Sequence, residues 1–515
     1  MVDLILYNAN IITMNPAFSN VQLVAIKDGK IQNVARNDSF KELRNKNTRV
    51  VDCSGKTVLP GFIDAHCHFH AFAESLVTLN LEPRNNVRSI TGIRDKIRQA
   101  SQKLPTGAWI RGRGYNEFYL TEKRHPTRWD LDAATPLHPI KLTHRSGRAH
   151  VLNSLALELI GISKETADPP EGLIDRNIET GEPTGLLYGM GDDLAKAVPP
   201  MDNEQMEYGI KLAGMELNSL GITSIHDASP RNNFKRWEMV QRWKERGLLK
   251  SRVSMILGVE GFNEYQKNNL SAQVGENQLR FGGAKIILHE TTGRLSPSQE
   301  ELNEMVFNIH QAGSQAVLHA IEEKTIEAAC TAIEYALKNL PKSDHRHRIE
   351  HCSVCTPSLA KRLASLGIMV VTQPSFIYYN GERYLRTVQK EQLRHLYPIA
   401  TLMKKGIKVA GSSDCPIVPA NPLIGIYSAI SRMADTGETI LPEEGIAPLE
   451  ALKMYTEYAA KTTFEERIKG SITPGKLADL VVMNGDPTIL PADEIKDIEV
   501  EMTILNGEVV WDKMS

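Results

Sequence analysis

Two histidines separated by one residue end a short apolar stretch near the N-terminus. They are His66 and His68, and the stretch follows Leu59-Pro60. In a β-strand, side chains at positions i and i+2 leave the same face, so these two imidazoles would converge on one point. Imidazoles that converge at a strand end can bind a divalent metal. A bare His-x-His pair is more often just a strand with a polar end, so further ligands are needed to complete a site.

Strands alternate with helices through the middle of the chain, which is the pattern of parallel βα units. Eight such strands are predicted, and a parallel sheet of that number closes into a barrel. The fold class expected is therefore α/β, with a (β/α)8 TIM barrel. The predicted strands are residues 61–68, 223–227, 252–257, 283–288, 315–319, 348–351, 369–373 and 408–411.

Both ends of the chain predict short strands joined by turns. The Asn506-Gly507 pair between two strand-like runs is typical of a hairpin. We expect a small β-sandwich domain built from both termini, and an insertion over the mouth of the barrel, where substrate pockets form. The expected divisions are sandwich residues 1–58, barrel residues 59–468 with an insertion at about 80–200, and sandwich residues 469–515.

Reactive groups in such barrels project from the C-terminal ends of different strands. Any one histidine at such a position is more often a core or surface residue, but several together indicate a site. Neutral imidazole and carboxylate suit Zn²⁺ and related ions, with one position left open for water. Besides the first pair, the predicted strand ends supply His319, His351 and Asp414, and the fourth strand supplies Lys285.

Asp414 and Lys285 would have different roles in a metal site. A metal lowers the pKa of a bound water from about 15.7 to about 7, and Asp414 can accept the proton of the attacking water. Two metals need a bridging anion, which the ammonium of Lys285 cannot supply. A carbamate formed from its amine and CO₂ has two oxygens and can bridge them. The alternative is that Lys285 is an ordinary strand lysine.

Several motifs resemble those of the amidohydrolase superfamily. Residues 59–68 and 475–482 are similar to the segments that open the barrel and re-enter the sandwich in urease-like and hydantoinase-like enzymes. Residues 109–114, 221–228 and 346–351 resemble the amidohydrolase-3 branch, which includes N-substituted formamide deformylases. The resemblance covers nearly the whole chain. It implies that Lys285 is a carboxylated bridging lysine and that the metal ligands are His66, His68, His319, His351 and Asp414.

Two further segments bear on substrate binding. Many members of that branch continue the fourth strand into an Asp-Gly loop, but here it continues as residues 289–294, beginning His289-Glu290. This departure weakens the resemblance at Lys285 and predicts a distinct pocket, in which His289 or Glu290 contacts substrate or is simply an exposed loop residue. In the insertion, His144 and His150 can polarise a substrate carbonyl. His150 is the better candidate, because the branch places a histidine before an Asn-Ser pair.

Composition excludes several classes of function. The 515 residues include 60 Lys and Arg against 62 Asp and Glu, and a net charge of -2 argues against a nucleic-acid or membrane surface. No apolar run approaches the roughly 18 residues of a membrane span, and the first residues do not resemble a signal peptide. Six cysteines in so long a chain do not form a disulfide framework. We expect a cytoplasmic protein with a small-molecule substrate, and a homodimer as the commonest oligomer.

The sequence leaves three functions open. The leading hypothesis is a metal-dependent amidohydrolase that cleaves a non-peptide C–N bond in an amide, formamide or cyclic amide. Metal-bound hydroxide, with one or two Zn²⁺ ions per chain, would attack while Asp414 acts as general base and acid. The second hypothesis is a deaminase of a nucleobase-like ring, which would use one metal and no bridging lysine. The third is a non-catalytic scaffold, which the complete set of ligand positions disfavours.

Overall fold

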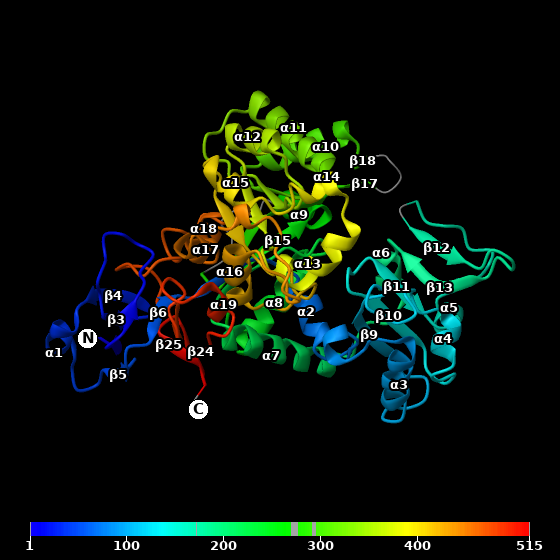
Figure 1. The fold of residues 1–515 in the computed structure, drawn as a ribbon, viewed down its shortest axis with the longest axis horizontal. Helices are drawn as coiled ribbons and strands as arrows, with labels where there is room; N and C mark the ends of the chain where they lie inside the picture. Colours follow the sequence, from blue (N-terminus) through cyan, green and yellow to red (C-terminus); the bar gives the residue numbers. More distant parts are fainter. Residues whose placement is uncertain (1, 171, 269–276, 291–294, 514–515) are drawn as a thin grey trace. The chain divides into compact units, whose positions relative to one another are not determined.

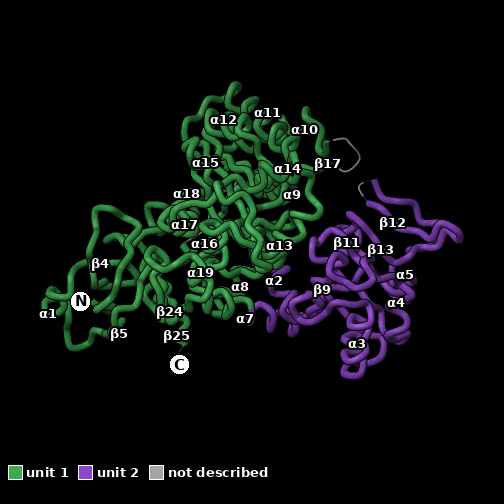
Figure 2. Tube along the Cα trace, viewed as in Figure 1, with its two compact units in different colours: residues 1–69, 213–515 green, residues 70–212 purple. Residues whose placement is uncertain are grey.

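The computed structural model describes the chain apart from residues 1, 171, 269–276, 291–294 and 514–515. The chain divides into two compact units, coloured separately in Figure 2. Unit 1 comprises Met1–Phe69 and Ala213–Ser515, and unit 2 comprises His70–Leu212. Among the residues described, no helix is both long enough and apolar enough to span a membrane.

An eight-stranded parallel sheet forms the centre of unit 1 (Figure 1). Its strands follow one another in chain order. The two outer strands are joined by backbone hydrogen bonds, from the Asp414 amide to the His66 carbonyl and from the His68 amide to the Cys415 carbonyl, both 2.8 Å. The predicted barrel is confirmed, and all eight predicted strands are present with ends that differ by a few residues. They are β7 (Phe62–Cys67), β14 (Ile222–Asp227), β15 (Arg252–Gly258), β16 (Leu279–Ile287), β19 (Ala316–Ala320), β20 (Arg348–His351), β21 (Met369–Thr372) and β22 (Val409–Gly411).

Helices connect the barrel strands, and several of them bury one apolar stripe. In α11 (Glu323–Asn339), Ile326, Ala329, Ile333 and Ala336 recur at helical spacing and are buried. Sequence signals also set where helices begin: in α10, Ser298 and Glu301 form a capping box. The longer helices of the barrel are α8 (Phe234–Glu245), α9 (Val259–Lys267), α10 (Gln299–Gln311), α11, α12 (Pro357–Ser365), α13 (Ser375–Thr387) and α16 (Pro422–Ser431). The division between the units falls within α7 (Asn203–Ser219), after Leu212.

A β-sandwich drawn from both termini completes unit 1, as predicted. One sheet has the order β4-β3-β1-β5, and the other, β2-β6-β23-β24-β25, pairs strands from opposite ends of the chain. The hairpin at Asn506-Gly507 turns through two residues with positive φ, 54° and 78°, which matches a type I′ turn. The strands are β1 (Leu4–Tyr7), β2 (Asn10–Ile11), β3 (Leu23–Lys27), β4 (Lys30–Ala35), β5 (Arg49–Asp52), β6 (Thr57–Pro60), β23 (Leu480–Met483), β24 (Val500–Leu505) and β25 (Glu508–Asp512).

Unit 2 is built on a six-stranded sheet of order β12-β13-β11-β10-β9-β8. A cluster of buried side chains, including Ile93, Leu131 and Leu142, forms its core. The strands are β8 (Leu79–Asn80), β9 (Ile110–Tyr115), β10 (Ile140–His144), β11 (Ala149–Leu152), β12 (Leu173–Arg176) and β13 (Pro183–Tyr188), and the helices include α3 (Ile90–Ser101), α4 (Arg128–Asp132) and α5 (Ser154–Leu159).

Candidate metal centre

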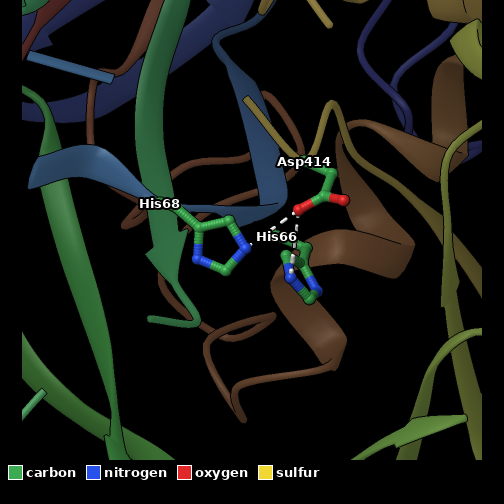
Figure 3. A group of neighbouring side chains, drawn as sticks. All are labelled: His66, His68 and Asp414. Carbon is green, nitrogen blue, oxygen red and sulfur yellow. Dashed lines mark ion pairs between the residues drawn. The ribbon is translucent and has the colours of Figure 1, made fainter. Parts of the chain in front are cut away.

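Three predicted ligands converge at the C-terminal end of the barrel strands. One ligand atom from each of His66, His68 and Asp414 lies within 4.8 Å of the other two (Figure 3). The Oδ1 atom of Asp414 is 3.0 Å from His68 Nε2 and 3.5 Å from His66 Nε2. His66 and Asp414 are buried and His68 is half-buried. The two ends of the barrel sheet, far apart in the sequence, therefore supply one cluster.

Asp64 holds the two segments of this cluster together. It lies two residues before His66 on β7, so its side chain shares the face of that histidine. Its carboxylate accepts hydrogen bonds from the amides of His66, at 3.2 Å, and Ser413, at 3.0 Å, and from the Ser413 hydroxyl. Asp414 then follows with a φ of 58°. That left-handed backbone costs about 1–3 kcal/mol in a non-glycine residue, and the Asp64 contacts help to offset it.

His351 and His319 extend the cluster from the neighbouring strands β20 and β19. The ring centroids of His351 and His66 are 4.9 Å apart, and those of His319 and His351 are 4.3 Å apart. The Nδ1 atom of His351 is 2.9 Å from Gln373 Oε1, and the Gln373 amide donates to Ser412 Oγ at 3.0 Å. Because Gln373 occupies Nδ1, the other ring nitrogen of His351 is the one available to a metal.

Lys285 points into the same region from β16. Burial lowers the pKa of its amine to about 8, although the charges of Glu350 and Asp414 act to raise it. Its own charge in turn lowers the pKa values of His66 and His351, behind the larger effect of burial. Its Nζ atom is buried and has no hydrogen-bond partner among the described residues. The structure therefore places a poorly solvated amine beside the imidazoles.

The donor atoms of the cluster fit a divalent cation. Burial raises the pKa of Asp414, but the His68 and His66 imidazoles lower it by a larger amount. The pKa of this carboxyl group therefore lies below its usual range. Both His66 Nε2 and Asp414 Oδ1 are buried without a hydrogen bond to any described residue, despite their proximity. Buried polar atoms are normally satisfied, and a cation between these two would satisfy both. Imidazole nitrogen and carboxylate oxygen are ligands that Zn²⁺ accepts.

The predicted substrate-binding histidine of the insertion lies in unit 2. His150, on β11, has Nδ1 3.2 Å from the hydroxyl of Thr143 on the paired strand β10. His144, at the end of β10, has Nε2 2.7 Å from a carboxylate oxygen of Glu117. The contact of His150 with substrate stays a prediction.

The segment after β16 is described only in part. His289 and Glu290 form the short strand β17 (His289–Glu290) and are both half-buried. Glu290 makes an ion pair of 2.8 Å with Lys324 on α11. Residues 291–294, the rest of the predicted loop, lie outside the described residues. A role for His289 at the substrate stays a prediction.

Comparisons with known proteins decide the family. Residues 49–511 match the model of the amidohydrolase family Amidohydro_3. The chain belongs to this family. It is similar to the N-substituted formamide deformylase of Arthrobacter pascens, with 28% identity across 100% of this chain and 99% of the relative. YtcJ of Bacillus subtilis (strain 168) is also 28% identical, over 98% of each chain.

Solved structures agree on the fold of this amidohydrolase. An uncharacterized metal-dependent hydrolase from Pyrococcus horikoshii OT3 superposes with a TM-score of 0.77 at 23% identity, over 95% of this chain and 99% of that one. A likeness at this identity shows the fold. The family and its relatives, by contrast, bear on the activity: this chain is an enzyme, a hydrolase of carbon–nitrogen bonds.

The structure of the amidohydrolase adds residues that the sequence did not single out. Gln373 contacts His351, and Ser229 Oγ lies 3.4 Å from His68 Nδ1. A carboxylate oxygen of Glu350 contacts His66 Nδ1, and both side chains are fully buried. The sequence did contain one signal for Glu350, which directly precedes His351 in a predicted buried strand. A charged residue in such a strand needs a buried partner.

Proposed function

We propose that this amidohydrolase hydrolyses a non-peptide C–N bond of an amide, formamide or cyclic amide with the help of bound Zn²⁺. The observation that carries the proposal is the convergence of His66, His68 and Asp414 within 4.8 Å. Two of the donor atoms, His66 Nε2 and Asp414 Oδ1, are buried and no described residue satisfies them. His351 and His319 adjoin this group and are proposed as further ligands. When bound there, a divalent metal acidifies a coordinated water and polarises the carbonyl of the substrate.

Asp414 is proposed as the proton-transfer residue. Its low pKa keeps the carboxylate ionised at neutral pH, so it can take up the proton of the attacking water. The same oxygen atoms can then pass that proton to the leaving nitrogen, which departs as a neutral amine. Its Oδ1 atom lies 3.0 Å from His68 Nε2 and 3.5 Å from His66 Nε2, which places it among the proposed ligands.

Lys285 is proposed to carry a carbamate when two metals are bound. A pKa of about 8 leaves more of its amine neutral at physiological pH than an exposed lysine would have. The neutral amine adds to CO₂ and loses a proton, which gives a group with one negative charge and two oxygens. A site with one metal does not need this group, so the metal count and the state of Lys285 are linked.

N-substituted formamides are the first substrates to test, because one full-length relative is a deformylase by name. His150 and His289 are proposed to contact the substrate. The zinc-loaded enzyme is assayed against N-formyl amines, N-acetyl amines, cyclic imides and aminopyrimidines, with amine or ammonia release as the readout. Turnover of a formamide, amide or imide that is lost in Asp414→Asn supports the proposal. Activity on aminopyrimidines alone would overturn it.

A deaminase remains the second candidate, because the three converging ligands can hold a single metal. The two functions differ at Lys285. One metal per chain with full activity in Lys285→Ala favours deamination, whereas two metals and a large loss in that variant favour the bridged amidohydrolase.

We also propose a cytoplasmic enzyme that acts on a small molecule, as a homodimer and without a nucleic-acid or membrane partner. All six cysteines are buried and free, which suits a reducing compartment. The 62 acidic residues nearly balance the 60 basic residues, which supports the absence of a polyanionic partner. Light scattering at several concentrations tests the dimer.

A further inference from the structure

A buried ion pair lies behind His66, on the side of its ring away from Asp414. Glu350 contacts Nδ1 of His66 with one carboxylate oxygen, and Arg348 Nε lies 2.6 Å from the other. None of these three side chains is exposed to solvent. The two nitrogens of the His66 ring thus have different neighbours, because Nε2 is 3.5 Å from Asp414.

The backbone of β20 explains how Glu350 and His351 can both reach His66. In a regular strand, consecutive side chains point to opposite faces. His351 instead has a φ of 73°, and Cys352 follows with 49°. These left-handed residues end the strand, so that the His351 ring lies 4.9 Å from the His66 ring while Glu350 contacts the same histidine. Non-glycine residues in this conformation are uncommon and tend to occur where function requires them.

Arg348 holds the carboxylate of Glu350 in place. It is two residues before Glu350 and therefore shares its face of β20. Its guanidinium donates to the Ala65 carbonyl at 3.4 Å and lies 3.5 Å from His226 Nδ1. These contacts join β20 to β7 and β14 in the interior of the barrel. A carboxylate buried alone is costly, and the guanidinium compensates it.

We propose that Glu350 is a positioning residue that holds the His66 ring with Nε2 directed at the metal, and that Arg348 keeps Glu350 in place. The inference rests on the proposed metal-dependent function. A histidine ligand whose other nitrogen is held by a carboxylate presents a fixed lone pair, and removing such a partner typically weakens metal binding about 10- to 100-fold.

The test measures zinc affinity of the full-length protein by competition with a fluorescent chelator, independently of activity. Glu350→Ala is expected to raise the zinc dissociation constant about 10- to 100-fold, and Glu350→Gln, which retains an acceptor oxygen, to raise it less. In the Co²⁺-loaded protein, both variants should change the visible absorption spectrum, which reports ligand geometry. Glu350→Gln also serves if the alanine variant does not fold.

Glu465→Gln is the matched control, because Glu465 is also a buried carboxylate, paired with Lys469 at 2.9 Å. It should lower stability without changing zinc affinity or the cobalt spectrum. Folded Glu350 variants with wild-type zinc affinity and an unchanged spectrum would overturn the inference alone. A wild-type protein that binds neither zinc nor cobalt would overturn the proposed function as well, so the two failures are distinguishable.

Discussion

Gln373→Leu tests whether His351 is a metal ligand. Gln373 is fully buried, accepts from His351 Nδ1 at 2.9 Å and donates to Ser412 Oγ at 3.0 Å. Leucine has a similar size but no acceptor, so the buried Nδ1–H loses its partner, at a cost of about 1–3 kcal/mol. If the ring shifts to recover a bond, metal affinity falls about 10- to 100-fold. That loss of metal affinity corresponds to roughly 1.4–2.8 kcal/mol, at 1.4 kcal/mol per tenfold. It is similar in size to the cost of leaving the buried Nδ1–H without an acceptor.

The assay for Gln373→Leu is chelator competition on the folded protein. Gln373→Glu retains an acceptor for Nδ1 and is expected to bind zinc more tightly than the leucine variant. Gln315→Leu is the control, because Gln315 is another buried glutamine, whose amide donates to the Thr462 carbonyl at 2.8 Å before β19 begins. A zinc dissociation constant for Gln373→Leu within twofold of wild type would refute the assignment of His351.

Two further predictions concern stability. Asp479→Ala leaves the buried guanidinium of Arg252 without the carboxylate that it contacts at 2.6 and 2.9 Å. The free energy of unfolding, measured in urea, should fall by about 3–5 kcal/mol. A loss under about 1 kcal/mol, as for a surface ion pair, would contradict this prediction. His347 is fully buried, accepts from the Ala316 amide and contacts His310, and its pKa lies well below the usual value because of burial and then His345. The unfolded chain therefore binds an extra proton below about pH 6.5, so stability falls as pH decreases, by at most about 1.4 kcal/mol per pH unit for this group. Unfolding of His347→Gln should depend less steeply on pH between 7 and 5, and an equally steep dependence would contradict the argument.

The barrel could be predicted from the sequence because its strands are buried on both faces and read as short apolar runs. The C-terminal end of each run then shows directly which side chains reach the site. His66 and His68 share a face by strand periodicity, and Asp414 follows the last strand. The strand limits were less well predicted at β16. This strand was expected to begin at residue 283, but it begins at Leu279, before its two glycines.

The contacts behind the ligands could not be predicted, because they depend on backbone conformations that residue types do not reveal. Glu350 and His351 are neighbours in the sequence, and regular alternation places them on opposite faces. Only the left-handed φ of His351 brings both to His66. The partnership of Gln373 with Ser412 likewise depends on how two neighbouring strands align, which no single segment determines.

Zinc binding by equilibrium dialysis tests the central claim most directly. The metal-depleted protein is dialysed against micromolar Zn²⁺, and bound zinc is measured by elemental analysis for the wild type and for His66→Ala and Asp414→Asn. The proposed centre predicts one or two zinc ions per wild-type chain and much weaker binding in both variants. A folded wild-type protein that binds no zinc, or variants that bind it as tightly as wild type, would contradict the claim.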